Sequence, residues 1–143
     1  MILPDLNLLL YAYNQDSPKH KSAKIWWESL MNHSRPVGLA WIVVLGFIRI
    51  STHRKIQENP LPVEVACAHA RSWLAQPHVV ILHPGSKHSE ILFGLLENLG
   101  TAGNLTTDAH LAALAIEFQA ELHSTDSDFA RFSGLKWVHP MRD

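Results

Sequence analysis

Short apolar runs alternate along the whole chain with segments whose apolar residues recur every three to four positions. Apolar runs of this kind predict strands, and the longer spacing predicts amphipathic helices. The predicted strands are residues 1–3, 36–39, 79–82, 121–123 and 136–139. The predicted helices are residues 6–13, 18–32, 41–50, 62–74, 88–99 and 106–118, with a short helical turn at 129–132. Strands that alternate with helices favour a parallel sheet covered on both faces, so the fold class is α/β, as a three-layer α/β/α sandwich.

The same patterns predict which side chains are buried. Residues 79–82 are apolar at every position, which predicts a strand buried on both faces. Helical spacing places Val63, Leu74 and Phe118 toward the core. The segment Trp41–Ile50 is apolar on nearly every side, so we expect either the fold or a second copy of the chain to cover it. A homodimer is the simpler interpretation.

Length and composition narrow the class of protein. A chain of 143 residues with 47% apolar and 17% charged side chains fits a single domain spanning residues 1–143. Its longest near-continuous apolar run, Leu39–Ile50, is shorter than the roughly 20 residues of a membrane span, and the amino terminus lacks the pattern of a secretory signal. We therefore expect a cytoplasmic protein with no membrane association.

Charge and metal-ligand residues exclude further classes. The net charge of −1 does not indicate a general nucleic-acid binder, so a polyanion would need a local basic patch. One cysteine, Cys67, allows neither an intrachain disulfide nor a cysteine-based zinc site. The ten histidines are scattered, without a metal-binding spacing.

Three acids are placed where the functional residues of parallel sheets commonly lie, beyond the carboxyl ends of the strands. Asp5 follows the first predicted strand, Asp126 follows a late one, and Asp108 lies in the first turn of a helix. Carboxylates that converge repel one another, so such a placement favours a hard cation such as Mg²⁺ or Mn²⁺ between them. The chemistry indicated is metal-assisted phosphoryl hydrolysis. Taken singly, Asp108 also suits a helix start, and Asp126 also suits a turn.

Neighbouring polar residues suggest auxiliary roles. Asn7 is placed either to orient the Asp5 carboxylate or simply to begin a helix. Arg49 stands at the edge of an apolar segment, where a cation needs a carboxylate or phosphate partner. Two basic runs are either RNA-phosphate contacts or solvated faces, namely Arg49 with His53, Arg54 and Lys55, and Lys19 with Lys21 and Lys24.

Three blocks of the sequence together resemble a known family. They are Asp5–Ala12 (DLNLLLYA), Thr107–Ala115 (TDAHLAALA) and Thr125–Phe132 (TDSDFARF). In this order they look like the PIN-domain ribonucleases, and within them the VapC-type toxins of bacterial toxin–antitoxin pairs. The resemblance spans the chain from its first strand to Trp137–Pro140.

The resemblance implies a fold, an activity and partners. The fold is a five-stranded parallel sheet, and the activity is that of a Mg²⁺- or Mn²⁺-dependent endoribonuclease acting on RNA. The implied partners are a second copy of the chain and a small antitoxin encoded alongside. By position, Asp5, Asp108 and Asp126 match the first, third and fourth acids of the family, with Asp128 as an auxiliary carboxylate.

One position departs from the family pattern. Where these toxins commonly have glutamate before an aromatic-x-arginine, this chain has Gly46, which offers no ligand. Occupancy by one or by two cations is therefore open, as is the choice of a displaced acid among Glu58, Glu64, Glu90 and Glu97.

Two alternative functions follow from these departures. A catalytically degenerate PIN fold would bind RNA or an antitoxin without cleavage. The other alternative, an aspartyl-phosphate phosphatase, is disfavoured because Asn7 stands in place of the second acid of its motif and because the chain is short.

Overall fold

Within residues 1–141, which the computed structural model describes, five strands form one parallel sheet in the order β3-β2-β1-β4-β5. The elements in chain order are β1 (Ile2–Pro4), α1 (Leu6–Tyr13), α2 (His20–Asn32), β2 (Val37–Leu39), α3 (Trp41–Ser51), α4 (Val63–Leu74), β3 (Val79–Ile81), α5 (His88–Leu99), η1 (Gly103–Leu105), α6 (Thr106–Glu117), β4 (Glu121–His123), η2 (Ser127–Arg131) and β5 (Trp137–Val138). The predicted α/β class and the five-stranded parallel sheet are confirmed.

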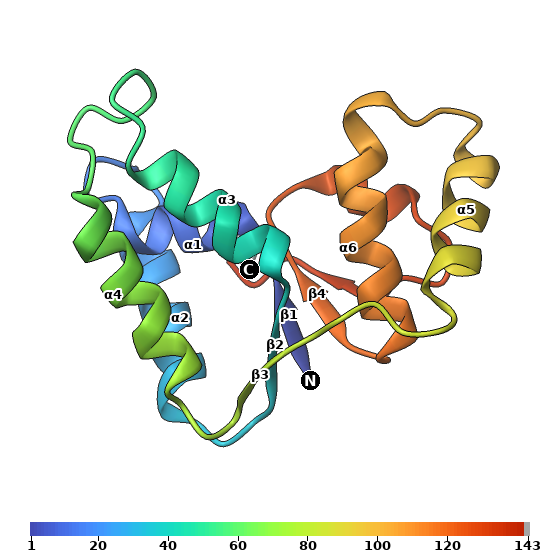
Figure 1. Cartoon of the computed structure of the whole chain (residues 1–143), viewed down its shortest axis with the longest axis horizontal. Coiled ribbons are helices and arrows are strands. Elements are labelled where there is room, and N and C mark those ends of the chain that lie inside the picture. The colour runs from blue at the N-terminus through green and yellow to red at the C-terminus, as the bar shows by residue number, and fades with distance from the viewer. Residues whose placement is uncertain (142–143) are drawn as a thin grey trace.

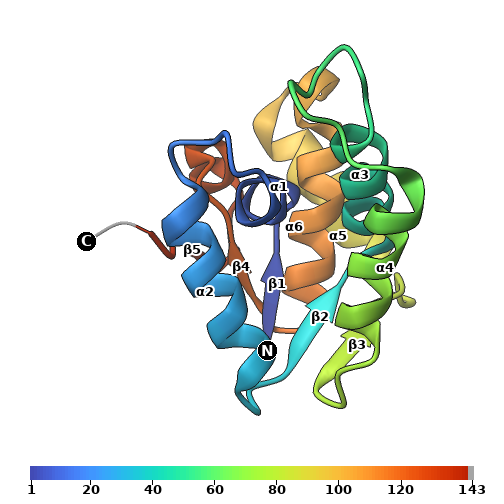
Figure 2. The same cartoon turned by 90° about the vertical axis from the view of Figure 1, so that its left-hand side faces the viewer.

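Helices cover both faces of the sheet. In Figure 1 the strands separate α1, α2 and α4 from α5 and α6. Figure 2, turned by 90°, looks onto the first of these faces, and α5 and α6 lie behind the strands. Helix α3 packs against α1 and α4, and α5 packs against α6. The predicted three-layer arrangement is therefore confirmed.

The central strands set the position of the polar residues that follow them. All three residues of β1 and of β2 are buried, as expected for strands in the middle of a covered parallel sheet. Strand β1 pairs with β4 so that Pro4 lies opposite His123. The N–H of Asp5 then donates to the carbonyl of His123 at 2.9 Å. The residues directly after β1 and β4 therefore meet at the carboxyl edge of the sheet.

The prediction that residues 79–82 form a strand buried on both faces is wrong. Strand β3 lies at the edge of the sheet, and Val80 is 45% exposed. An edge strand has a neighbour on one side only, so its side chains are covered less than those of an inner strand. The apolar run predicted the strand correctly but carried no information about its rank in the sheet.

Three side chains predicted to face the core are exposed instead. Val63 is 53% exposed, Leu74 is 38% exposed and Phe118 is 39% exposed. Val63 and Leu74 are the first and last residues of α4, and Phe118 directly follows α6. The helical pattern therefore overstates burial at the ends of these helices. The middle positions are buried as predicted, among them Ala66, Ala70, Trp73, Leu111, Leu114 and Ala115.

Helix α3 is covered on one face only. It buries Val43, Val44 and Phe47 in the core, whereas Trp41 and Leu45 are 45% and 61% exposed. The fold alone therefore does not cover this apolar helix. Among the described residues, no helix combines the length and the apolar character that crossing a membrane requires.

Candidate metal centre

Four acidic side chains come together at the carboxyl edge of the sheet. Asp5 follows β1, Asp108 lies in the first turn of α6, and Asp126 and Asp128 lie at and just after the cap of η2. The carboxylates of Asp108, Asp126 and Asp128 each offer an oxygen within 4.8 Å of the other two. Asp5 does not belong to this set of mutually close oxygens, although its charge contributes to raising the pKa of Asp108. The fold thus assembles acids that are more than one hundred positions apart in the chain.

Both oxygens of the Asp5 carboxylate accept hydrogen bonds. Oδ1 accepts from the N–H of Leu6 at 2.7 Å, and Oδ2 accepts from the hydroxyl of Ser124 at 2.7 Å. The first of these bonds caps α1, so Asp5 also has a structural role. The two hydrogen bonds together fix the orientation of the Asp5 carboxylate without a ligand.

Ser124 links Asp5 to Asp126, and it was not among the predicted site residues. It is fully buried, and its hydroxyl donates to Asp5 while it accepts from the N–H of Asp126 at 3.0 Å. One side chain therefore positions acids that follow two neighbouring strands. The available signal was a small polar residue directly after a predicted strand and two positions before an aspartate. Serine in a turn is so common that this signal did not stand out.

Asn7 does not contact Asp5 directly. Its amide donates to Oγ1 of Thr125 at 2.9 Å and lies 3.5 Å from the Ser124 hydroxyl. Within the described part of the chain, its Oδ1 is buried without a hydrogen-bond partner. Asn7 thus fastens α1 to the segment after β4 and reaches Asp5 only through Ser124.

Asp126 and Asp128 form a local turn as well as part of the acidic group. Oδ1 of Asp126 accepts from the N–H of Asp128 at 2.9 Å and caps η2. Asp126 therefore also has the structural role in a turn that the sequence allowed. A carboxylate oxygen of Asp128 lies within 4.8 Å of one of Asp108.

The charges of the group oppose one another. Burial, followed by the charges of Asp5, Asp126 and Asp128, raises the pKa of Asp108 to about 6. Burial also raises the pKa of Asp5, against the lowering effect of its hydrogen bonds from Ser124 and Leu6. A hard divalent cation would relieve this repulsion and prefers oxygen ligands, so these residues fit Mg²⁺ or Mn²⁺.

We expect the metal-free protein to lose stability as pH rises through the range in which Asp108 ionises. The unfolded chain releases this proton near pH 3.8, whereas the folded chain holds it up to about pH 6. Stability that depends on Asp108 therefore falls across this interval and levels off above it. Asp108→Asn removes the titration, so in EDTA its melting temperature should exceed that of the parent by a margin that grows between these pH values. A difference in melting temperature that does not depend on pH would contradict the raised pKa of Asp108.

The predicted auxiliary residue Arg49 and the position that departs from the family pattern, Gly46, both lie on α3. Arg49 is exposed, and no carboxylate of residues 1–141 forms an ion pair with it. Gly46 is buried in the middle of the helix. Among the described residues, the acidic group contains none of Glu58, Glu64, Glu90 and Glu97, so no displaced glutamate joins it.

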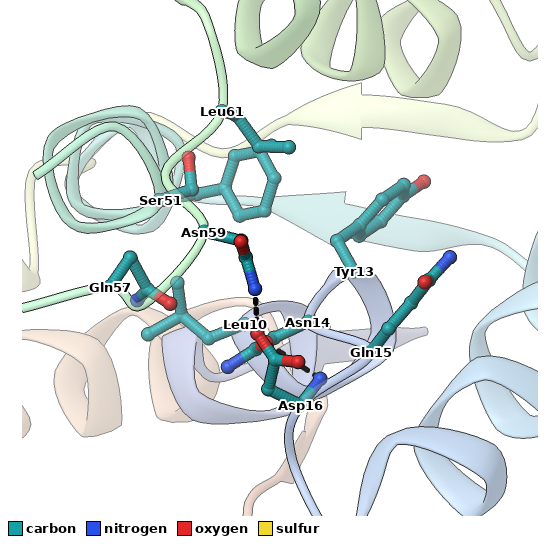
Figure 3. Close-up of a pocket in the computed structure, with 10 residues that line it drawn as sticks. Leu10, Tyr13, Asn14, Gln15, Asp16, Ser51, Gln57, Asn59 and Leu61 are labelled. Carbon is teal, nitrogen blue, oxygen red and sulfur yellow. Dashed lines mark hydrogen bonds between the residues drawn. The ribbon is translucent and has the colours of Figure 1, made fainter. Parts of the chain in front are cut away.

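A separate pocket lies near the far end of α1 (Figure 3). Its volume is about 310 Å³, and its lining includes Leu10, Tyr13 and Leu61 but none of the four acids. A hydrogen bond of 2.9 Å from Asn59 to Asp16 joins the two loops that border it. The pocket is therefore distinct from the acidic group.

Comparison with known proteins places the chain in a family. The model of the PIN domain matches residues 2–135. Ribonuclease VapC33 of Mycobacterium tuberculosis is 48% identical over the full length of both chains. Ribonuclease VapC37 of the same organism is 42% identical over 98% of this chain and 97% of the relative.

Solved structures share the fold at low sequence identity. The Mycobacterium tuberculosis toxin VapC20, described as cleaving the sarcin–ricin loop, superposes with a TM-score of 0.68 at 18% identity, over 95% of this chain and 99% of that one. VapBC2 from Rickettsia felis, bound to a DNA fragment of its promoter, gives 0.67 at 20% identity, over 96% and 98%. The match of the PIN model along nearly the whole chain and the full-length similarity to VapC ribonucleases establish that this chain belongs to the PIN-domain family, as a member of the VapC type.

Proposed function

We propose that this chain is a metal-dependent endoribonuclease that hydrolyses RNA phosphodiester bonds and acts as the toxin of a toxin–antitoxin pair. The observation that carries the proposal is the convergence of four carboxylates at one edge of the sheet. Similarity to ribonucleases VapC33 and VapC37 supports the same activity and RNA as the substrate.

The acids divide the work of the site. Asp5, Asp108 and Asp126 are the metal-binding and catalytic residues, and Asp128 is an auxiliary carboxylate whose oxygen lies within reach of the same ion. A bound Mg²⁺ or Mn²⁺ supplies a water of lowered pKa and neutralises charge on the phosphate. Ser124 holds Asp5 and the backbone of Asp126 in place, and Asn7 supports that arrangement from α1.

A basic stretch provides contacts for the RNA backbone. No Asp or Glu occurs between Glu28 and Glu58, whereas Arg49, Arg54 and Lys55 fall in the second half of that stretch. Arg49 is exposed and free of carboxylate partners among residues 1–141, so it is available to a phosphate.

Cleavage by the purified protein tests the function directly. We expect structured RNA to be cut in the presence of Mg²⁺ or Mn²⁺, to survive in EDTA, and to be cut again when the cation is restored in excess. RNA that is bound but left intact under every metal condition would instead favour the degenerate PIN fold, which the glycine at position 46 motivates.

A small protein antitoxin is the proposed natural partner. Structural neighbours include a complex described as a toxin–antitoxin complex from Klebsiella pneumoniae, with a TM-score of 0.62 at 19% identity, and VapBC2 from Rickettsia felis. A short reading frame immediately upstream of the gene, whose product copurifies with this chain and inhibits cleavage, is the expected finding.

We further propose a homodimer formed through the exposed face of α3. Trp41, Ile42 and Leu45 present apolar side chains that the fold leaves at least 36% exposed. Clustered exposed apolar side chains commonly mark an interface. Leu45→Glu should convert a dimer to a monomer in sedimentation velocity at micromolar concentration, because it places a charge on the face of α3 that the dimer would bury.

Ile25→Glu is the matched control for this change. Ile25 is 60% exposed, close to the 61% of Leu45, but it lies on α2. The control should sediment like the parent. A parent protein that is monomeric at micromolar concentration contradicts the dimer.

A further inference from the structure

Helix α1 begins directly after Asp5, and its first residue makes an apolar contact with α3. Leu6 begins α1, and α1 packs against α3. A Cβ atom on Gly46 would lie only 2.6 Å from Cδ2 of Leu6. Real Cβ atoms do not approach so closely, so the end of the Leu6 side chain must move if residue 46 is larger than glycine. The leucine side chain thus occupies the space into which a side chain of α3 would point.

Helix α3 brings no carboxylate to this region. Arg49 is the one charged residue in its sequence, and it is exposed. The buried residues of the helix are Val43, Val44, Gly46, Phe47 and Ser51. Apart from Ser51 at its end, the buried residues of α3 are apolar or glycine, so α3 would add no carboxylate to a cation placed between it and Asp5.

The other carboxylates all come from the opposite direction. Asp108 belongs to α6, and Asp126 and Asp128 follow β4. In Figure 1, α6 and β4 lie across β1 from α1. Asp5 is also tied toward that side, because its Oδ2 accepts from Ser124. The other three carboxylates therefore lie on one side of Asp5, and α3 on its other side adds none.

The two ions of a two-metal hydrolytic site lie about 3.5–4 Å apart. Mg²⁺ is commonly held by one or two carboxylates together with waters and substrate phosphates. A second ion on the α3 side would have Asp5 as its one carboxylate, and both oxygens of Asp5 already accept hydrogen bonds. We propose that this centre holds one divalent cation, on the side of Asp108, Asp126 and Asp128, and that Leu6 packed on Gly46 closes the α3 side to a second. This inference rests on the proposed function, because it assumes that the acidic group binds a metal.

Counting bound Mn²⁺ tests the inference without reference to activity. Titration of the full chain followed by electron paramagnetic resonance, checked by isothermal calorimetry, should give one Mn²⁺ per chain. Leu6→Ala/Gly46→Glu removes the obstructing side chain and adds a carboxylate from α3, so it should bind two. The matched control is Leu6→Ala/Gly46→Gln, which has the same shape without the charge and should bind one. Circular dichroism establishes that both variants are folded.

The outcomes separate this inference from the proposed function. Two Mn²⁺ per parent chain overturn the single-cation centre and leave the nuclease proposal intact. No Mn²⁺ binding at all overturns both. One ion in the parent and one in the folded Leu6→Ala/Gly46→Glu variant overturn the role of Leu6 and Gly46 in excluding the second ion. If the double variants do not fold, the count on the parent chain still decides the number of cations.

Discussion

Asp108→Asn is expected to abolish metal-dependent RNA cleavage while leaving the fold intact. The substitution keeps the size of the side chain but removes one charge from a group whose oxygens lie within 4.8 Å of one another. Loss of a partner outside the ligand shell typically costs about 10–100-fold in metal affinity or activity, so loss of a ligand should exceed ~100-fold. Cleavage rate and Mg²⁺ affinity, measured on the same preparation, check this expectation.

Stability separates a metal ligand from a residue that only begins a helix. Removing Asp108 relieves repulsion from Asp5, Asp126 and Asp128, so the metal-free variant should melt at the same temperature as the parent or higher. Asp108 lies in the first turn of α6 but does not cap it, so if its role were only to interact with the helix dipole, Asp108→Ala should cost about 0.3–1 kcal/mol of stability. An Asp108→Asn variant that cuts RNA at the parental rate rules out Asp108 as an essential ligand.

Ser124→Ala is the second change with a large expected effect. It removes the donor to Oδ2 of Asp5 and the acceptor of the Asp126 N–H in a fully buried position. We expect Mg²⁺ affinity to fall about 10–100-fold, because both acids lose a positioning contact. The groups left without partners should also lower the free energy of unfolding by about 1–3 kcal/mol. Calorimetric titration with Mg²⁺ and urea denaturation measure the two effects separately.

Ser51→Ala is the matched control for this substitution. Ser51 is also buried, but its hydroxyl has no hydrogen-bond partner among residues 1–141 and it lies at the end of α3. Its removal should change neither Mg²⁺ affinity nor cleavage and should leave stability nearly unchanged. If Ser124→Ala binds Mg²⁺ as tightly as the control does, Ser124 only fills the interior and does not position the acids.

Local patterns in the sequence determined the elements and the class of this fold. The periodicity of apolar residues is a local property that follows from backbone geometry, so β1, β2 and the helices lie where it predicts them. The placement of Asp5 and Asp126 after strands is local as well. The rule that parallel strands end at a common edge was then enough to predict that these acids meet.

Only the tertiary structure decided which groups contact one another. The rank of β3 at the sheet edge depends on how the other strands pair, and this left Val80 exposed against expectation. The bond from Ser124 to Asp5 joins residues 119 positions apart, which no local spacing can indicate. Likewise, Leu6 faces Gly46 only because α1 packs on α3. Such contacts depend on the relative positions of whole elements, which the packing of the core sets, so sequence supplied the acids and tertiary structure decided how they are held.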